Sequence, residues 1–156
     1  METVKILKPQ PMMDRIEIRQ DLGAEKDVVW AGMAQLKQVF INIMINAADA
    51  MIDTHSSDGL SPKVLDIETE NEDDSIIISF TDTGIGISSE ELGRIFDPFY
   101  TTKEPGKGTG LGLSVCYTII EGLGGRIRAE SVLGKGTELI VAIPLNRANR
   151  KLNIEH

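Results

Sequence analysis

The sequence predicts one α/β domain. Its 156 residues fit a single domain, and 41% hydrophobic residues are enough to build a core. Two segments carry apolar residues at helical spacing, and several shorter ones alternate apolar and polar residues as half-buried strands do. Residues 1–12, with Pro9 and Pro11, are interpreted as a linker or fragment end, and residues 147–156 as a polar tail.

The first half of the chain is predicted to form strands and then a long helix. Residues 16–22 alternate apolar with polar side chains, which indicates a strand, and residues 28–30 are interpreted as a short second strand. Residues 34–51 carry a wide apolar stripe at helical spacing, which predicts a mostly buried helix. A loop rich in Ser, Asp, Gly and Pro follows at residues 55–62.

The second half is predicted to add further strands and a second long helix. The expected strands are residues 64–69 and 75–82, joined by an acidic turn at 71–74, and residues 126–131 and 138–143 around a glycine turn. Ser88 begins a short helix that runs towards Ile95, and residues 112–123 form the second long helix. Prolines and glycines at residues 96–109 break any regular element, so we expect a mobile lid there.

Charge and composition exclude several functions. The net charge of −8 argues against nucleic acid as a partner, since phosphate backbones require clustered Lys and Arg. Cys116 is the one cysteine, so no disulfide can form within the chain, and we expect it in the core. The sequence has no signal peptide and no apolar stretch of about 18 residues. We therefore expect a cytoplasmic domain, and the sequence leaves open whether a longer parent protein is membrane-anchored.

Glycine stands at every second position from Gly106 to Gly112, directly ahead of the second long helix. Glycine lets backbone N–H groups approach an anion, and a helix N-terminus adds unpaired amides and the positive end of its dipole. The run therefore indicates a site that binds phosphate groups, but a single glycine-rich run could equally be a flexible surface loop. Two accompanying motifs favour a phosphate cradle instead. The run does not match the Walker A motif for nucleotide binding, because Gly108 stands where that motif needs Ser or Thr.

The first accompanying motif is a pair of amides. Asn42 and Asn46 lie one turn apart on one face of the first long helix. Such amides are costly to bury unless partnered, and Mg²⁺ takes one or two protein oxygens together with water and phosphates. The alternative to metal binding is that the two amides form hydrogen bonds with neighbouring backbone. Taken without the other motifs, these two residues favour that alternative. Asp49 falls on nearly the same face, as a solvated group or as support for the metal ligands.

The second motif is Asp82, which ends a strand before Gly84 and Gly86. A carboxylate fixed there only accepts hydrogen bonds, which suits an exocyclic amine such as N6 of adenine. Ile87 and apolar side chains of the first long helix would form the walls of a purine slot. An Asp that caps its own turn is the alternative.

Four motifs together resemble the N, G1, F and G2 boxes of the catalytic ATP-binding domain of sensor histidine kinases. They are residues 38–51, 82–87, 95–103 and 106–113, in family order, and the likeness covers roughly residues 13–146. The motifs are similar to those of the nitrogen-regulatory and sporulation branches. The resemblance implies a Bergerat-type α/β two-layer sandwich, with a mixed β-sheet covered on one face by helices and ATP between the Asn helix and the lid.

The resemblance also implies site residues. Asn42 and Asn46 would serve Mg²⁺, and with Lys103 they are the implied catalytic residues. Phe96 and Phe99 would anchor the lid, and Lys103 and Lys107 would reach the phosphates, with solvated lysines as the alternative. The implied ATP-binding residues are Asn46, Asp49, Asp82, Gly84, Gly86, Ile87, Phe96, Phe99, Lys103, Lys107, Gly108, Thr109, Gly110, Leu111, Gly112, Leu113 and Thr137.

One family feature is missing. The family's phosphoacceptor is a His followed directly by an acidic residue, whereas this chain has His55 before Ser56 and a terminal His156. We therefore expect a fragment or a component acting in trans, which binds MgATP and phosphorylates a histidine on a separate dimerisation domain that then serves a response regulator. The isolated domain is expected to be monomeric and the parent kinase homodimeric.

Two other functions are weighed against this one. Conformational ATPases of the gyrase, Hsp90 and mismatch-repair type share the fold, but carry a general-base Glu where this chain has Asn42, and an amide cannot take a proton from water. A non-catalytic ATP-binding module is disfavoured because all four boxes look intact.

Overall fold

The structure is a computed structural model that describes residues 2–52, 61–101 and 112–146. Its elements are α1 (Glu2–Leu7), the 3-10 helix η1 (Pro11–Met13), β1 (Glu17–Leu22), α2 (Met33–Ile52), β2 (Val64–Glu72), β3 (Ser75–Asp82), α3 (Ser89–Leu92), α4 (Gly112–Gly122), β4 (Arg126–Val132) and β5 (Gly136–Pro144). Both predicted long helices and the five strands at residues 16–22, 64–69, 75–82, 126–131 and 138–143 are confirmed, with ends shifted by a few residues.

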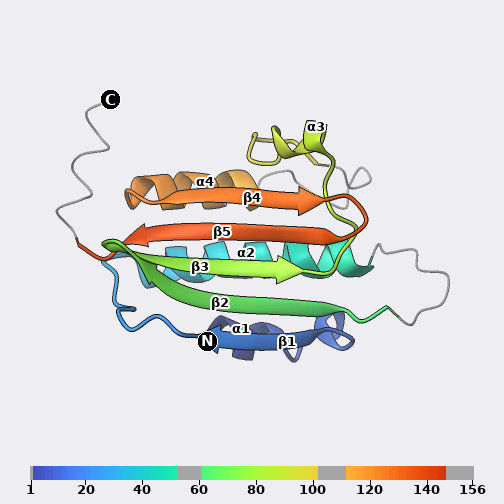
Figure 1. Ribbon diagram of the computed structural model, residues 1–156, viewed down its shortest axis with the longest axis horizontal. Helices are drawn as coiled ribbons and strands as arrows, with labels where there is room; N and C mark the ends of the chain where they lie inside the picture. The colour runs from blue at the N-terminus through green and yellow to red at the C-terminus, as the bar shows by residue number, and fades with distance from the viewer. Residues whose placement is uncertain (1, 53–60, 102–111, 147–156) are drawn as a thin grey trace.

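The strands form one mixed sheet in the order β1-β2-β3-β5-β4. β1 runs parallel to β2, and the other neighbouring pairs are antiparallel. Helices α1, α2 and α4 all lie behind the sheet in Figure 1, while the other face of the sheet is open. The expected α/β two-layer sandwich, with a mixed sheet covered on one face, is confirmed.

The core lies between the sheet and these helices. β3 shows how the strand alternation builds it, since Ile76, Ile78, Phe80 and Asp82 are buried on the helix-covered face and the residues between them are more exposed. On the other side, the apolar stripe of α2 supplies Val39, Ile43, Met44, Ala47, Ala48 and Met51. The last inward position of β3 is therefore a buried carboxylate at the edge of an apolar core.

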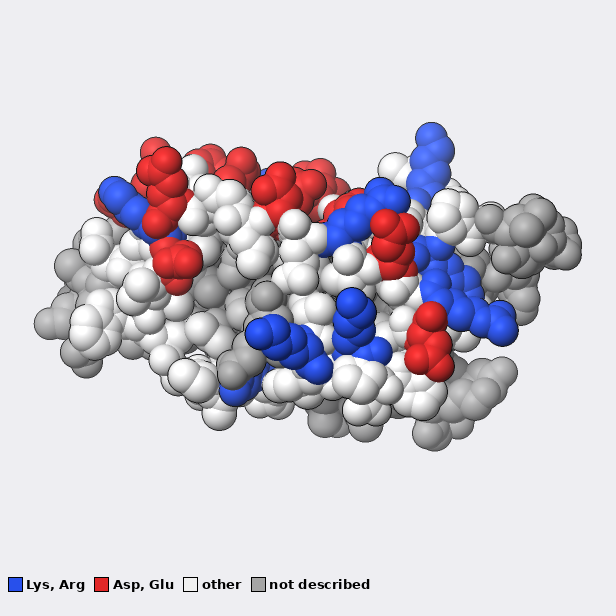
Figure 2. Space-filling view, turned by 90° about the horizontal axis from the view of Figure 1, so that it is seen from below, with Lys and Arg blue, Asp and Glu red and all other residues white. Residues whose placement is uncertain are grey.

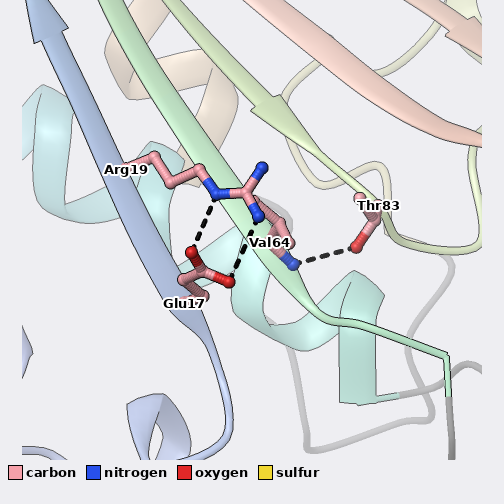
Figure 3. A network of polar contacts seen from close by, with 4 residues as sticks. All are labelled: Glu17, Arg19, Val64 and Thr83. Carbon is pink, nitrogen blue, oxygen red and sulfur yellow. Dashed lines mark hydrogen bonds and ion pairs between the residues drawn. The ribbon is translucent and has the colours of Figure 1, made fainter.

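The open face of the sheet is strongly acidic along β2. The acidic residues of this strand alternate with inward-facing ones; they are Asp66, Glu68, Glu70 and Glu72. Figure 2 shows Asp and Glu side chains gathered along the upper edge of the molecule in that view, which is the open face of the sheet. On the neighbouring β1, Arg19 donates to Glu17 at 2.9 Å (Figure 3). This exposed pair contributes little to stability.

Two sequence predictions are wrong. Residues 28–30 are not a strand. The segment just before them is bound by the Asn71 side chain, which accepts a hydrogen bond from Lys26 N at 2.9 Å and donates one to Lys26 O at 2.8 Å. Residues 1–12 were interpreted as a linker or fragment end, but α1 forms there and buries Val4 and Leu7. Six residues are too few for a clear helical period, so only contact with the core reveals this helix.

Two predicted loops are only partly described. Residues 53–60, of the predicted loop at 55–62, and residues 102–111, of the predicted lid at 96–109, lie outside the described residues. In the part of the chain that is described, no helix combines the length and apolar character needed to cross a membrane.

Candidate functional site

The centre of the site is the Asp82 carboxylate at the end of β3. Its Oδ1 accepts from the backbone N–H of Gly84 at 2.8 Å and of Thr137 at 3.2 Å. Burial raises the pKa of Asp82, and the two backbone donors oppose that rise. Among the described residues, Oδ2 accepts no hydrogen bond, so a fixed and acceptor-only oxygen remains for a ligand.

The turn after Asp82 is held from two sides. Ile85 N–H donates to the carbonyl of Ala50 on α2 at 3.1 Å, and Ile85 O accepts from Gly134 N at 2.6 Å in the turn between β4 and β5. Ile87 N–H donates to Ser131 Oγ on β4 at 2.8 Å. These bonds fix the backbone around Asp82 without any ligand.

Glycine is required in this turn because the neighbouring backbone leaves no room for a side chain. A Cβ on Gly84 would lie 2.8 Å from the Ala50 backbone. Gly86 has φ +74, and a Cβ there would overlap the carbonyl of Val132. Both glycines thus serve the close packing of the turn against α2 and β4.

Thr83 anchors the same turn to β2, a role that sequence reasoning missed. Its Oγ1 accepts from Val64 N at 3.0 Å (Figure 3) and donates to Pro62 O at 3.0 Å. No local pattern marks this contact, since it depends on the start of β2 lying beside the end of β3.

The structure brings the two asparagines of α2 to the start of α4. Asn42 Nδ2 donates to Gly112 O at 3.4 Å, and a Cβ on Gly112 would lie 3.8 Å from Asn46 Nδ2. Burial raises the pKa of the Cys116 thiol to about 11, and the Asn42 amide opposes that rise. Cys116 is therefore an unreactive core residue, as expected, and Asn42 makes the backbone hydrogen bond that was the alternative to metal binding.

The two lid phenylalanines differ. Phe96 packs at the core, with its ring 5.8 Å from that of Tyr117, beside a cavity of about 420 Å³ next to α4. Phe99 is 76% exposed and has φ +66. Phe99 is therefore not buried by the described residues, and because residues 102–111 of the lid lie outside them, its role as a lid anchor stays a prediction.

The remaining predicted residues divide into three groups. Ile87, Leu113 and Asp49 are partly buried, and Thr137 is buried next to Asp82. The structure does not describe Lys103, Lys107, Gly108, Thr109, Gly110 and Leu111. Among the described residues, no group of three or more His, Cys, Asp and Glu side chains is placed to hold a metal ion.

The family described as "Histidine kinase-, DNA gyrase B-, and HSP90-like ATPase" matches residues 33–147. The chain belongs to this family. Its fold is similar to that of the catalytic domain of histidine kinase ThkA, which is 31% identical with a TM-score of 0.78 over 96% of this chain and 91% of that one.

The relatives of this ATPase domain in sequence are sensor kinases. Sporulation kinase E of Bacillus subtilis (strain 168) is 39% identical over 94% of this chain, and Sensor kinase CckA of Brucella abortus (strain 2308) is 40% identical over 83%. The chain spans 19% of the first relative and 14% of the second. It thus corresponds to one domain of these longer proteins.

Proposed function

We propose that this chain is the MgATP-binding catalytic domain of a two-component sensor histidine kinase, acting in the cytoplasm. It transfers the γ-phosphoryl group of ATP to a histidine on a separate dimerisation domain, from which the phosphoryl group passes to a response regulator. The Asp82 carboxylate carries this proposal, because one oxygen is fixed by two backbone donors and the other is left to accept from a ligand amine.

Adenine is the base that fits this carboxylate. Its 6-amino group donates to Asp82 Oδ2, beside the turn formed by Gly84 and Gly86. The triphosphate then extends towards the start of α4, where Asn46 and Gly112 lie. The glycine run before α4 and the side chains of Lys103 and Lys107 bind the phosphates.

The asparagine pair suits Mg²⁺. Amide oxygens are hard ligands, and Mg²⁺ needs only one or two of them when phosphates and water complete its shell. Asn42 and Asn46 would hold the ion, which would supply positive charge that offsets the charge of the β- and γ-phosphates.

The residues of this chain act by positioning. The turn at Asp82 is fixed before the nucleotide binds, so the base sets the orientation of the phosphates relative to Asn46 and Lys103. Asn42 stands where a hydrolytic base would be needed, which favours transfer to a histidine over hydrolysis. This geometry supports a kinase better than a conformational ATPase.

Phosphoryl transfer in trans tests the proposal. The purified chain is incubated with ATP labelled at the γ-phosphate, alone and with the dimerisation and phosphoacceptor domain of the parent protein. We expect acid-labile label only in the mixture, and none when the acceptor histidine is changed to Gln. Label on the isolated chain, or fast phosphate release without a partner, would overturn the proposal.

Metal binding has its own test. Asn42→Ala and Asn46→Ala should each weaken Mg²⁺-dependent ATP binding, which a titration with and without EDTA measures. Because the Asn42 hydrogen bond to Gly112 is long, its loss should cost the nucleotide-free protein only about 0.5–1.5 kcal/mol of unfolding free energy. A much larger loss would assign Asn42 to folding alone.

A further inference from the structure

Ser131 lies at the end of a row of polar side chains that crosses three strands. Ser131 on β4 pairs directly with Thr137 on β5. Thr81 of β3 pairs with Glu138 of β5, so the next position places Asp82 opposite Thr137. Asp82, Thr137 and Ser131 are thus neighbours on the helix-covered face, where paired side chains have Cβ atoms about 5 Å apart.

The hydrogen bonds of Ser131 Oγ indicate where the hydroxyl protons of Ser131 and Thr137 lie. Three atoms lie at 2.8 Å from it, namely Ile87 N, Gly136 O and Thr137 Oγ1. The amide of Ile87 can only donate to Ser131, and the carbonyl of Gly136 can only accept. Two oxygens 2.8 Å apart need a proton between them, and the Gly136 carbonyl has none to give, so we assign the single hydroxyl proton of Ser131 to the bond with Gly136.

This leaves one arrangement for Thr137. Ser131 has no second proton to give, so the Thr137 hydroxyl must donate its own proton to Ser131 Oγ. Any further hydrogen bond of Thr137 Oγ1 can only be one that it accepts. The backbone N–H of Thr137 meanwhile donates to Asp82 Oδ1, which leaves two acceptors, Asp82 Oδ2 and Thr137 Oγ1, on residues that lie opposite each other in neighbouring strands.

We propose that Ser131 is a positioning residue that fixes Thr137 as a hydrogen-bond acceptor and so selects purines with a 6-amino group over purines with a 6-oxo group. The inference rests on the proposed function, because it concerns the base of the same nucleotide. A 6-amino group carries two N–H donors for the two acceptors. A 6-oxo group presents an oxygen to them and leaves buried acceptors unpaired, which discriminates strongly between ligands.

Without Ser131 the polarity of Thr137 is no longer fixed. In Ser131→Ala, the Thr137 hydroxyl loses its acceptor and can turn its proton towards the ligand. It can then donate to a 6-oxo group as readily as accept from a 6-amino group. The preference between the two bases therefore falls even if the pocket keeps its shape.

ATP and ITP test this, since ITP replaces the 6-amino group of ATP by an oxo group. Their affinities are measured by competition against a fluorescent ATP analogue for the wild-type chain and its variants. We expect Ser131→Ala to reduce the ratio of ATP to ITP affinity by about tenfold. Ser131→Thr keeps a hydroxyl and should keep the ratio, and Ser79→Ala, on the open face of β3, should leave both affinities unchanged.

A role of Ser131 in holding the fold would give a different result. Because Ser131 also binds Ile87 and Gly136, its loss could weaken both nucleotides equally, and then the ratio would stay constant and the inference would be overturned. Thr137→Val removes the hydroxyl that Ser131 orients, so it should lower the ratio itself and abolish the further effect of Ser131→Ala. This variant also keeps the test valid if Ser131→Ala does not fold. Failure of the wild-type chain to bind ATP would instead overturn the proposed function.

Discussion

At the scale of single residues, Asp82 combines a cost in stability with the role in ligand binding that we propose for it. Its side chain is only 8% exposed, and burial raises its pKa because a charged carboxylate loses hydration there. The hydrogen bonds from the backbone N–H groups of Gly84 and Thr137 offset part of this lost hydration. A residue that only capped its own turn would bond Gly84 alone, whereas Asp82 also bonds Thr137 from another strand.

Asp82→Asn should separate binding from stability. The amide oxygen can still accept from Gly84 and Thr137, but an NH₂ group replaces Oδ2 and repels a donor. ATP affinity should fall by the equivalent of about 1–3 kcal/mol, while the unfolding free energy at pH 7 should be equal to or above that of the wild type. Nucleotide titration and urea unfolding measure the two effects, with Asp66→Asn on the open face as control.

The pH dependence of this difference follows from the raised pKa. A folded-state pKa above the ordinary value of 3.8 means that the stability contributed by protonated Asp82 is complete below 3.8 and is lost as the pH rises through the folded value. The advantage of Asp82→Asn should therefore be absent at low pH and grow to a plateau towards pH 7. A variant less stable than the wild type at pH 7 would contradict this account.

At the scale of elements, the sequence predicts the periodic parts of the fold and misses the contacts between them. α2 and β3 were predicted because their apolar residues repeat with periods of helix and strand over many positions. Ser131 and Thr83 gave no signal, since their roles depend on which strands are neighbours. Phe99 was expected to anchor the lid because residues 95–103 resemble the F box, and the described residues leave its side chain 76% exposed.

Two glycines offer a matched test of how tightly the turn after Asp82 is packed. Gly86 and Gly134 both have positive φ, at +74° and +83°, so Ala at either site costs about 1–2 kcal/mol of backbone strain. Only at Gly86 would the new Cβ also overlap Val132, since Gly134 faces open space. Gly86→Ala should therefore lose at least about 1 kcal/mol more unfolding free energy than Gly134→Ala, and it alone should weaken ATP binding.

Thermal or urea unfolding of both variants gives the comparison directly. Gly122→Ala is the control, because Gly122 has no positive φ, an added Cβ there would meet no atom of another element within 4 Å, and Ala favours a helix. Equal losses for Gly86→Ala and Gly134→Ala would show that backbone strain, and not contact with β4, explains the glycine in this turn.

At the scale of the whole molecule, the two faces of the sheet have different roles. The helix-covered face holds the core and, at its edge, the row from Asp82 to Ser131. The open face carries the acidic side chains of β2, which contribute to the net charge of −8 and keep this face solvated. Binding of an anionic nucleotide by so acidic a chain therefore depends on local backbone donors and a few cations, as the fixed turn and the start of α4 provide.

The helical layer also includes α1, which the sequence did not predict. Leu7 is 6% exposed and Ile6 is 45% exposed on the same short helix, so the pair reports whether α1 belongs to the folded domain. Leu7→Ala should lower the unfolding free energy by about 2 kcal/mol or more, and Ile6→Ala by less than about 1 kcal/mol. Urea unfolding measures both values, and equal small effects would mean that α1 is not part of the cooperative unit and that the domain begins after it.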